Sequence, residues 1–380
     1  MAKLGEICTF QSGGTPSKTH SEYFGGNIPW VSTTALNGNV IKESDAVAWI
    51  TPKAIQESAA KIVPANSIMV GTRVGIGKVA VNSVEMSTSQ DVISLVGIDE
   101  SKWHKPYLCE LLSSKKDYFN SQARGATIKG IKIDIVANVE IPGISYAKQK
   151  HIADILYKVK CLISLRKQQL SKLDELVKAR FVEMFGDPVK NTMDWEIKPL
   201  SELGELNRGV SKARPRNSPE LLGGPYPLIQ TGEVANAKTY ITSFNSTYSE
   251  KGLAQSKMWP KGTLCITIAA NIAQTSILTF DACFPDSVVG FISRNMTNEL
   301  FIHYWFSFFQ KILDEQAPQV AQKNINLKIL SELNVIVPPL SLQNQFATFV
   351  ERVDQQKQTV QQSLEKLELM KKALMQEYFG

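Results

Sequence analysis

The chain repeats a long segment of itself, and this repeat constrains its fold more than any other feature of the sequence. Residues 149–186 align without a gap with residues 343–380 at a constant offset of 194 residues, and 12 of the 38 paired positions are identical. Self-similarity at a fixed spacing indicates a repeat architecture. Because the spacing is about half of the 380-residue chain, we expect two copies of a whole module rather than a solenoid of small units.

Both copies of the repeat carry a heptad pattern of apolar residues. Neither contains a Pro, and Gly occurs only as the last residue of each, so each copy predicts one long helix with a coiled-coil face, roughly 55 Å long at about 1.5 Å per residue. Such a stripe is either part of the core of one bundle or a seam between the two helices, and we favour two helices that pack on each other as a rod.

The predicted seam follows one register in each copy. In the first copy it consists of Ile152, Leu156, Val159, Ile163, Arg166, Leu170, Leu173, Val177, Arg180 and Met184. In the second copy it consists of Phe346, Val350, Val353, Lys357, Val360, Leu364, Leu367, Lys371, Leu374 and Tyr378. The cations that interrupt this pattern would select the pairing register at a cost in stability.

A fainter repeat relates the segments that precede the two helices. GGNIPWVST at residues 25–33 matches GGPYPLIQT at residues 223–231, and SQDVI around Val92 matches PDSVV around Val288. Short apolar runs bounded by Gly, Pro and Asn predict strands and turns, with helical segments between them. We therefore predict an α+β chain of two repeated, α/β-mixed domains, each followed by a helix. The predicted order is a globular domain at residues 1–145, a long helix at 146–186, a second domain at 187–340 and a second helix at 341–380.

Composition is typical of a soluble protein, with 43% apolar and 21% charged residues. The five cysteines are scattered without a C-x-x-C pair, so neither a disulfide framework nor a zinc site is predicted, and a reducing cytoplasm fits this pattern. The most apolar run, FIHYWFSFF at residues 301–309, is too short to cross a bilayer. We expect no membrane association.

The sequence contains no convincing catalytic motif. GTRVGIGKV at residues 71–79 lacks the spacing of a phosphate-binding P-loop, and there is no dinucleotide-binding fingerprint. Asp91 with Glu100 and Lys102 is the closest approach to a nuclease metal site, but the second copy does not retain it. We therefore expect a chain that is not an enzyme and that has neither a cofactor nor a resident metal.

The positive charge is unevenly distributed, although the net charge is only +6. The first long helix region carries eight basic residues (Lys and Arg) and four acidic residues (Asp and Glu), whereas the second carries five basic and five acidic residues. Basic clusters also recur in loop-like segments rich in Gly, Ser and Asn. Each cluster taken alone is compatible with a solvated surface, but together they are typical of proteins that bind a phosphate backbone.

Two globular domains that alternate with two similar long helices resemble the specificity subunit of type I restriction-modification enzymes. LGEICTFQSGGTP at residues 4–16 resembles the usual start of a target recognition domain of this family, and IPGISYAKQKHIADIL at residues 141–156 resembles its usual exit. The segment at residues 182–206 is similar to the junction between the first helix and the second domain. The resemblance covers essentially the whole chain.

The resemblance implies a non-catalytic reader of double-stranded DNA. Each target recognition domain would bind one half of a split target, and the antiparallel coiled-coil helices would set the distance between the halves. Two methyltransferase subunits would dock on the helices and methylate adenine with S-adenosylmethionine, and restriction subunits would add ATP-driven cleavage. The alternative is an orphan or exchangeable recognition scaffold of a related methyltransferase system.

Two loops in each domain carry the candidate contacts with DNA. The loop at residues 71–81 has its counterpart at residues 267–277, and the loop at residues 123–132 has its counterpart at residues 319–328. Arg and Lys favour guanine edges whereas Asn and Gln favour adenine, so the two domains should read different bases. The candidate DNA-binding residues are Arg73, Lys78, Arg124, Lys129, Lys132, Arg208, Lys212, Arg214, Arg216, Asn271, Gln274, Lys323 and Asn324. The candidate partner-binding residues are Gln149, Ile152, Gln343 and Phe346.

Overall fold

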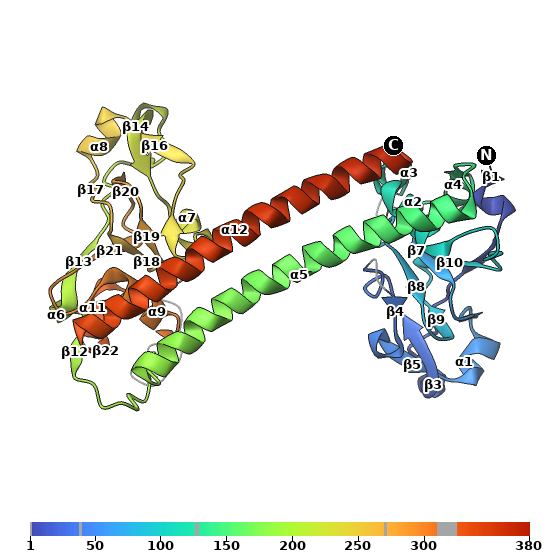
Figure 1. Cartoon of the computed structure of the whole chain (residues 1–380), viewed down its shortest axis with the longest axis horizontal. Coiled ribbons are helices and arrows are strands. Elements are labelled where there is room, and N and C mark those ends of the chain that lie inside the picture. Colours follow the sequence, from blue (N-terminus) through green and yellow to red (C-terminus); the bar gives the residue numbers. More distant parts are fainter. Residues whose placement is uncertain (1, 38–39, 126–128, 270–271, 310–324) are drawn as a thin grey trace. The chain divides into compact units, whose positions relative to one another are not determined.

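The computed structural model describes residues 2–37, 40–125, 129–269, 272–309 and 325–380. The chain divides into two compact units, the first formed by residues 1–166 and 363–380 and the second by residues 167–362. The division falls within both long helices, α5 (Tyr146–Phe185) and α12 (Leu340–Phe379), so each unit contains a part of each helix. Figure 1 labels the elements of both units.

The first unit is built around two sheets. The five-stranded sheet has the order β2 (Thr9–Ser12), β10 (Val92–Val96), β7 (Ile68–Gly71), β8 (Val79–Asn82) and β4 (Val40–Ile41). The four-stranded sheet has the order β5 (Ala48–Ile50), β3 (Phe24–Val31), β9 (Met86–Thr88) and β6 (Ile62–Val63). A two-stranded ladder pairs β1 (Ala2–Lys3) with β11 (Glu140–Ile141). The pairs β4–β8 and β3–β9 are parallel, and the other pairs of these sheets are antiparallel.

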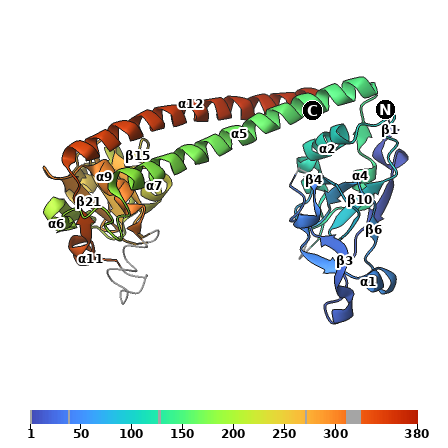
Figure 2. The same ribbon diagram turned by 60° about the horizontal axis from the view of Figure 1, so that its bottom comes forward.

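Short helices complete the first unit and connect its sheet to the long helices. They are α1 (Pro52–Glu57), α2 (Lys105–Ser114), α3 (Lys116–Gln122) and α4 (Ile133–Ala137), with 3-10 turns at Leu4–Glu6, Ser21–Tyr23 and Glu43–Asp45. The strands β7 and β10 are buried and, apart from Ser94, apolar because they lie in the interior of the sheet. Their side chains share one core with α2, the beginning of α5 and the end of α12, and α2 lies beside the long helices in Figure 2.

The second unit repeats this topology strand for strand. Its five-stranded sheet has the order β13 (Gly204–Arg208), β21 (Val288–Ser293), β18 (Leu264–Thr267), β19 (Thr275–Leu278) and β15 (Tyr240–Ile241). Its four-stranded sheet has the order β16 (Ser246–Tyr248), β14 (Leu222–Leu228), β20 (Ala282–Cys283) and β17 (Met258–Trp259), and β12 (Ile197–Pro199) pairs with β22 (Asn334–Ile336). Its described short helices are α6 (Leu200–Leu203), α7 (Thr231–Asn236), α8 (Glu250–Ala254), α9 (Glu299–Phe306) and α11 (Leu327–Glu332), with a 3-10 turn at Pro219–Leu221.

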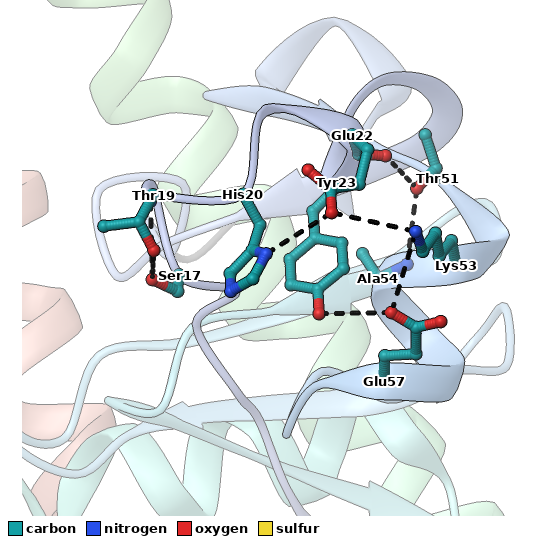
Figure 3. A network of polar contacts seen from close by, with 9 residues as sticks. All are labelled: Ser17, Thr19, His20, Glu22, Tyr23, Thr51, Lys53, Ala54 and Glu57. Atoms are coloured by element: carbon teal, nitrogen blue, oxygen red, sulfur yellow. Dashed lines mark hydrogen bonds and ion pairs between the residues drawn. The ribbon is translucent and has the colours of Figure 1, made fainter.

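The repeat extends to individual side chains at the edge of each four-stranded sheet. In the first unit, the Thr51 hydroxyl caps α1 and donates to the Glu22 carbonyl at 2.9 Å, as Figure 3 shows. In the second unit, the Ser249 hydroxyl caps α8 and donates to the Glu220 carbonyl at 2.7 Å. The lysine two residues after each cap pairs with the same glutamate, at 3.7 and 3.1 Å. The predicted fold class, two repeated α/β-mixed domains with long helices, is confirmed.

The two long helices have the same length and the same ending. Each contains 40 residues, and both of their boundaries differ by the sequence offset of 194. The backbone N–H of Gly186 donates to the Val182 carbonyl at 2.8 Å, and its φ of 75° is the left-handed conformation that ends helices at glycine. The shared final Phe-Gly of the repeat is therefore the point at which both helices end.

Within the second unit, the end of α5 packs against the beginning of α12, so these segments run antiparallel. Phe181 and Phe346 have ring centroids 5.5 Å apart. Further along, the Lys357 ammonium contacts the Asp174 carboxylate at 2.7 Å and the Asp354 carboxylate at 3.1 Å. Lys357 is nine-tenths buried. This cation of the predicted seam therefore lies between the helices and is matched by carboxylates.

The predicted seam needs a correction at the end of each helix. The buried residues there are Phe181 and Phe185 in α5 and Phe379 in α12, whereas the register predicted Arg180, Met184 and Tyr378. A straight helix has 3.6 residues per turn and drifts relative to a strict heptad, so the buried face moves by one residue. Each final aromatic residue instead packs against the domain of the unit in which that helix end lies: Phe185 contacts Phe301 in the second unit, and Phe379 contacts Tyr107 in the first unit.

Candidate nucleic-acid interface

The loop that joins β7 to β8 is a tight, backbone-bonded turn. The Gly77 N–H donates to the Gly71 carbonyl at 3.0 Å, and the Gly71 N–H donates to the Lys78 carbonyl at 2.9 Å. Gly75 and Gly77 have φ of 72° and 74°, which other residues adopt only with strain. The glycines of this segment therefore form a tight turn, in which Arg73, Val74 and Lys78 are exposed and Ile76 is buried.

The corresponding loop between β18 and β19 has the same backbone hydrogen bonds. The Ala273 N–H donates to the Thr267 carbonyl at 2.8 Å, and the Thr267 N–H donates to the Gln274 carbonyl at 2.9 Å. Ala273 has a φ of 58°, which a non-glycine residue adopts at a cost. The two turns are thus closed by the same pair of backbone hydrogen bonds, although their sequences differ.

In the first domain, the structure brings the two predicted contact loops together. The Ile131 N–H donates to the Thr72 carbonyl at 2.8 Å, and Arg124 and Gly130 form an antiparallel bridge. A Cβ atom at Gly130 would come within 3.0 Å of the Arg73 side chain, so a larger residue there would require that side chain to shift slightly. Two segments separated by about 50 residues of sequence therefore form one surface.

The predicted cations of this surface face solvent. The side chain of Arg73 is half exposed and lies 3.9 Å from the Asp91 carboxylate. The other candidates of this domain are also exposed: Lys78, Arg124, Lys129 and Lys132. A group of exposed cations on loops supported by a sheet is suited to contact phosphates and base edges.

In the second domain, three predicted arginines converge on one residue. The Arg216 Nη2 donates to the Asp286 Oδ1 at 2.6 Å, and the Arg214 Nη2 lies 4.0 Å from the Asp286 Oδ2. The Arg208 Nε donates to the backbone carbonyl of Asp286 at 2.9 Å. The intervening segment is held by Gln255, whose side-chain oxygen accepts the backbone N–H of Lys212 at 2.7 Å.

The remaining candidates of the second domain are placed only in part. Lys212 and Gln274 are exposed. Asn271, Lys323 and Asn324 lie outside the described residues.

A family model described as "Type I restriction modification DNA specificity domain" matches residues 1–175 and 192–369. The chain belongs to this family. It is 28% identical over 223 residues to the specificity subunit of the type I restriction enzyme MjaIX from Methanocaldococcus jannaschii, which covers 54% of this chain and 52% of that protein. It is 29% identical over 180 residues to the EcoR124I/EcoR124II specificity subunit from Escherichia coli, covering 46% of this chain and 44% of that protein. The chain thus spans about half the length of these curated relatives.

Solved structures of type I specificity subunits share the fold along the whole chain. The S subunit from M. genitalium has a TM-score of 0.60 at 16% identity and covers 100% of this chain and 95% of its own. A chain from a structure of type I restriction-modification complex assembly and conformational transition has a TM-score of 0.64 at 17% identity, with 100% and 96% covered. At such identity the likeness shows the fold alone.

The four predicted partner-binding residues of this specificity-domain chain need a correction. Gln149, Ile152, Gln343 and Phe346 are all at most 3% exposed. The Gln343 side chain accepts hydrogen bonds from Thr297 and Asn298 and donates to the Met296 and Pro338 carbonyls. Gln149 occupies the same place in the first unit and accepts from the His104 N–H at 3.0 Å. These side chains hold each helix to its own domain, so a partner would have to contact other residues.

From the sequence, Asp91 was considered only as a metal ligand of a nuclease, and Asp286 was not singled out at all. Asp91 and Asp286 lie in the turns that precede β10 and β21; Asp91 contacts Arg73, and Asp286 contacts Arg214 and Arg216. Nothing in the sequence marks either residue as a partner of an arginine, since an Asp before a strand is a common turn residue. The described residues contain no group of three or more His, Cys, Asp or Glu placed to hold a metal ion. No helix in the described ranges is long and apolar enough to cross a membrane.

Proposed function

We propose that this chain is the sequence-specific DNA-reading subunit of a type I restriction-modification complex, and that it is itself non-catalytic. The observation that carries the proposal is a repeated turn that is closed by the same two backbone hydrogen bonds in both domains, at Gly71 in the first and at Thr267 in the second, but that carries two sets of side chains. Arg73 and Lys78 stand in the first copy where Ala269 and Gln274 stand in the second. One fold with different reading groups is what recognition of a split, asymmetric target requires.

Each domain reads one half of the target, and the helices set the distance between the halves. The packed aromatic residues and the Lys357 ion pairs fix the register of the helices in the second unit, which supports such a role. Reading needs side chains at base edges, whereas methylation and cleavage need cofactor sites that this proposal assigns to other subunits. We place the complex in the cytoplasm, and the five free cysteines accord with its reducing conditions.

The methyltransferase subunits, two per chain, dock on the long helices through residues other than the buried four. Within the first unit, α5 exposes Tyr157, Leu162 and Leu165, and α12 exposes Leu369 and Met370, each at least 45% accessible. Large apolar side chains exposed on a helix are suited to a protein partner. Restriction subunits join the same complex and supply ATP-driven cleavage.

The test is co-expression of the chain with a methyltransferase subunit, followed by sequencing of methylated adenines across the host genome. The proposal predicts methylation at one split sequence that disappears when this chain is omitted. Methylation at the same sites without this chain would overturn the proposal. A Leu162→Glu, Leu165→Glu double variant should lose co-purification with the partner, and Lys158→Glu, a charge change at another exposed position of α5, serves as the control.

A further inference from the structure

The arginine cluster of the second domain is organised by one carboxylate. Arg214 and Arg216 follow β13, whereas Asp286 precedes β21, about 70 residues further along the chain. The Asp286 Oδ1 accepts from Arg216 at 2.6 Å, and the Oδ2 lies 4.0 Å from Arg214. The Arg214 Nη1 also donates to the Ser211 and Ala213 carbonyls, each at 2.8 Å. The Arg214 guanidinium is therefore held from more than one side, and the Arg216 guanidinium is held by a short charged hydrogen bond.

Stability does not account for this arrangement. The side chains of Asp286, Arg216 and Arg214 are 38%, 44% and 57% exposed, and ion pairs with such exposure contribute little to folding. A guanidinium has five N–H donors in a planar fork. Within the part of the chain that the structure describes, Arg216 donates one side-chain hydrogen bond, to Asp286, so its other N–H groups can bind a second acceptor. The carboxylate thus fixes the direction of the fork while leaving it able to bind.

The first domain has a related arrangement at the same turn. Asp91 precedes β10, and its carboxylate lies 3.9 Å from Arg73. Its backbone carbonyl accepts the Thr72 N–H at 2.8 Å, which ties the turn to the loop that carries Arg73. Asp91 is not aligned with Asp286, because at the offset of 196 residues that relates these strands Asp286 corresponds to Gln90. In each domain, therefore, an Asp in this turn contacts an arginine of the same domain, but the two Asp residues occupy adjacent rather than equivalent positions of the turn.

We propose that Asp286 is a positioning residue that presents Arg214 and Arg216 to DNA, and that it thereby sets the base selectivity of the half-site read by the second domain. Asp91 does the same for Arg73 in the first domain. The inference rests on the proposed DNA-reading function and deepens it. In this arrangement the carboxylate lowers the affinity for DNA in general, since it repels phosphates, and raises selectivity, since it restricts the directions from which the guanidinium groups can bind.

The test uses Asp286→Asn in the full chain, assembled with its methyltransferase subunits. This substitution keeps the shape of the side chain and the backbone carbonyl that binds Arg208, and it removes the charge. Discrimination between the correct second half-site and single-base variants of it should fall about 10-fold, a typical contribution of one well-oriented Arg contact. Affinity for unrelated DNA should rise, with a salt dependence steeper by up to about one phosphate equivalent.

Each domain serves as the internal control for a variant in the other domain. Asp91→Asn should relax the first half-site and leave the second unchanged, whereas Asp286→Asn should do the reverse. Glu202→Gln, an exposed carboxylate of α6, should change neither. Arg216→Lys keeps the positive charge but loses the fork, and it should reproduce the selectivity loss of Asp286→Asn without the gain in general affinity.

Unchanged discrimination and salt dependence in Asp286→Asn would overturn the inference. Equal loss at both half-sites would also overturn it, because that result indicates a general effect on folding or assembly. The proposed function fails separately, if the wild-type complex itself shows no sequence-dependent methylation.

Discussion

Replacement of Gln343 by leucine should weaken the attachment of the first turns of α12 to the second domain. The Gln343 Oε1 accepts from the Thr297 hydroxyl at 2.9 Å and from the Asn298 N–H at 3.2 Å. Its Nε2 donates to the Met296 and Pro338 carbonyls at 3.0 and 2.8 Å. Leucine has a similar volume and satisfies none of these groups, which remain enclosed because the position is fully buried.

The cost follows from the groups that lose a partner. A buried donor or acceptor left unsatisfied costs about 1–3 kcal/mol, but the Thr297 hydroxyl can rotate and the carbonyls retain other lone pairs, so we expect about 3 kcal/mol in total. For a unit of this size, each 1 kcal/mol lowers Tm by about 2–4 °C, which gives about 6–12 °C. Gln149→Leu should cost less, about 2 kcal/mol, because two of its three hydrogen bonds are longer, at 3.3 Å.

The assay is thermal unfolding together with hydrogen exchange, since a chain of two units does not unfold in one step. Exchange should accelerate at residues 296–299 and in the first turns of α12 in Gln343→Leu, and near His104 in Gln149→Leu. Gln356→Leu makes the same change at an exposed position of α12 and should alter stability by less than about 0.5 kcal/mol. If Gln343→Leu keeps the wild-type Tm and exchange but loses the methyltransferase subunits, the glutamine contacts the partner and the anchoring role is refuted.

Three further outcomes are expected. Burial, with a smaller effect of Lys357, lowers the pKa of His303 to about 4 from the usual 6.5. The folding free energy gained by keeping this imidazole neutral is fully present above pH 6.5, and about 3 kcal/mol of it is lost as the pH falls toward 4. His303→Gln should therefore flatten the pH dependence of Tm in this range, and an unchanged slope contradicts the assignment. Insertion of four residues between Leu170 and Leu173 adds about 6 Å of helix, and methylome sequencing should show a longer unspecified spacer with unchanged half-sites and some loss of affinity; an unaltered spacer with full activity means that the helices are not the ruler. The purified chain with S-adenosylmethionine alone should transfer no methyl groups to DNA, and robust methylation by it would show that it is an enzyme.

The repeat predicted the long helices because 38 aligned residues carry enough heptads to average out single exceptions. The exact seam was less predictable at the helix ends, where packing against Phe301 and Tyr107 decides which residue turns inward. These two contacts are made with residues of the globular domains, so the heptad pattern of the helices does not reveal them. The sheet order was also beyond the sequence, since pairs such as β3 and β9 join strands that are far apart in the chain.

The candidate site was predictable as far as charge and loop composition allow. Arg73 and the loop at residues 123–132 were predicted separately, and the structure joins them through Thr72 and Ile131. Gln149 and Gln343 illustrate the limit of such reasoning. A glutamine that anchors a helix internally and one that binds a partner look the same in sequence, and only the burial of the side chain distinguishes them.

Exchange of one domain tests the central claim most directly. Residues 1–145 would be replaced by the corresponding domain of another type I specificity subunit, and methylated adenines would be sequenced in cells that express the chimera with the methyltransferase subunits. If each domain reads its own half of the target, one half of the methylated sequence changes to that of the donor and the other half stays as in the wild type. A simultaneous change in both halves would contradict independent reading by two repeated domains.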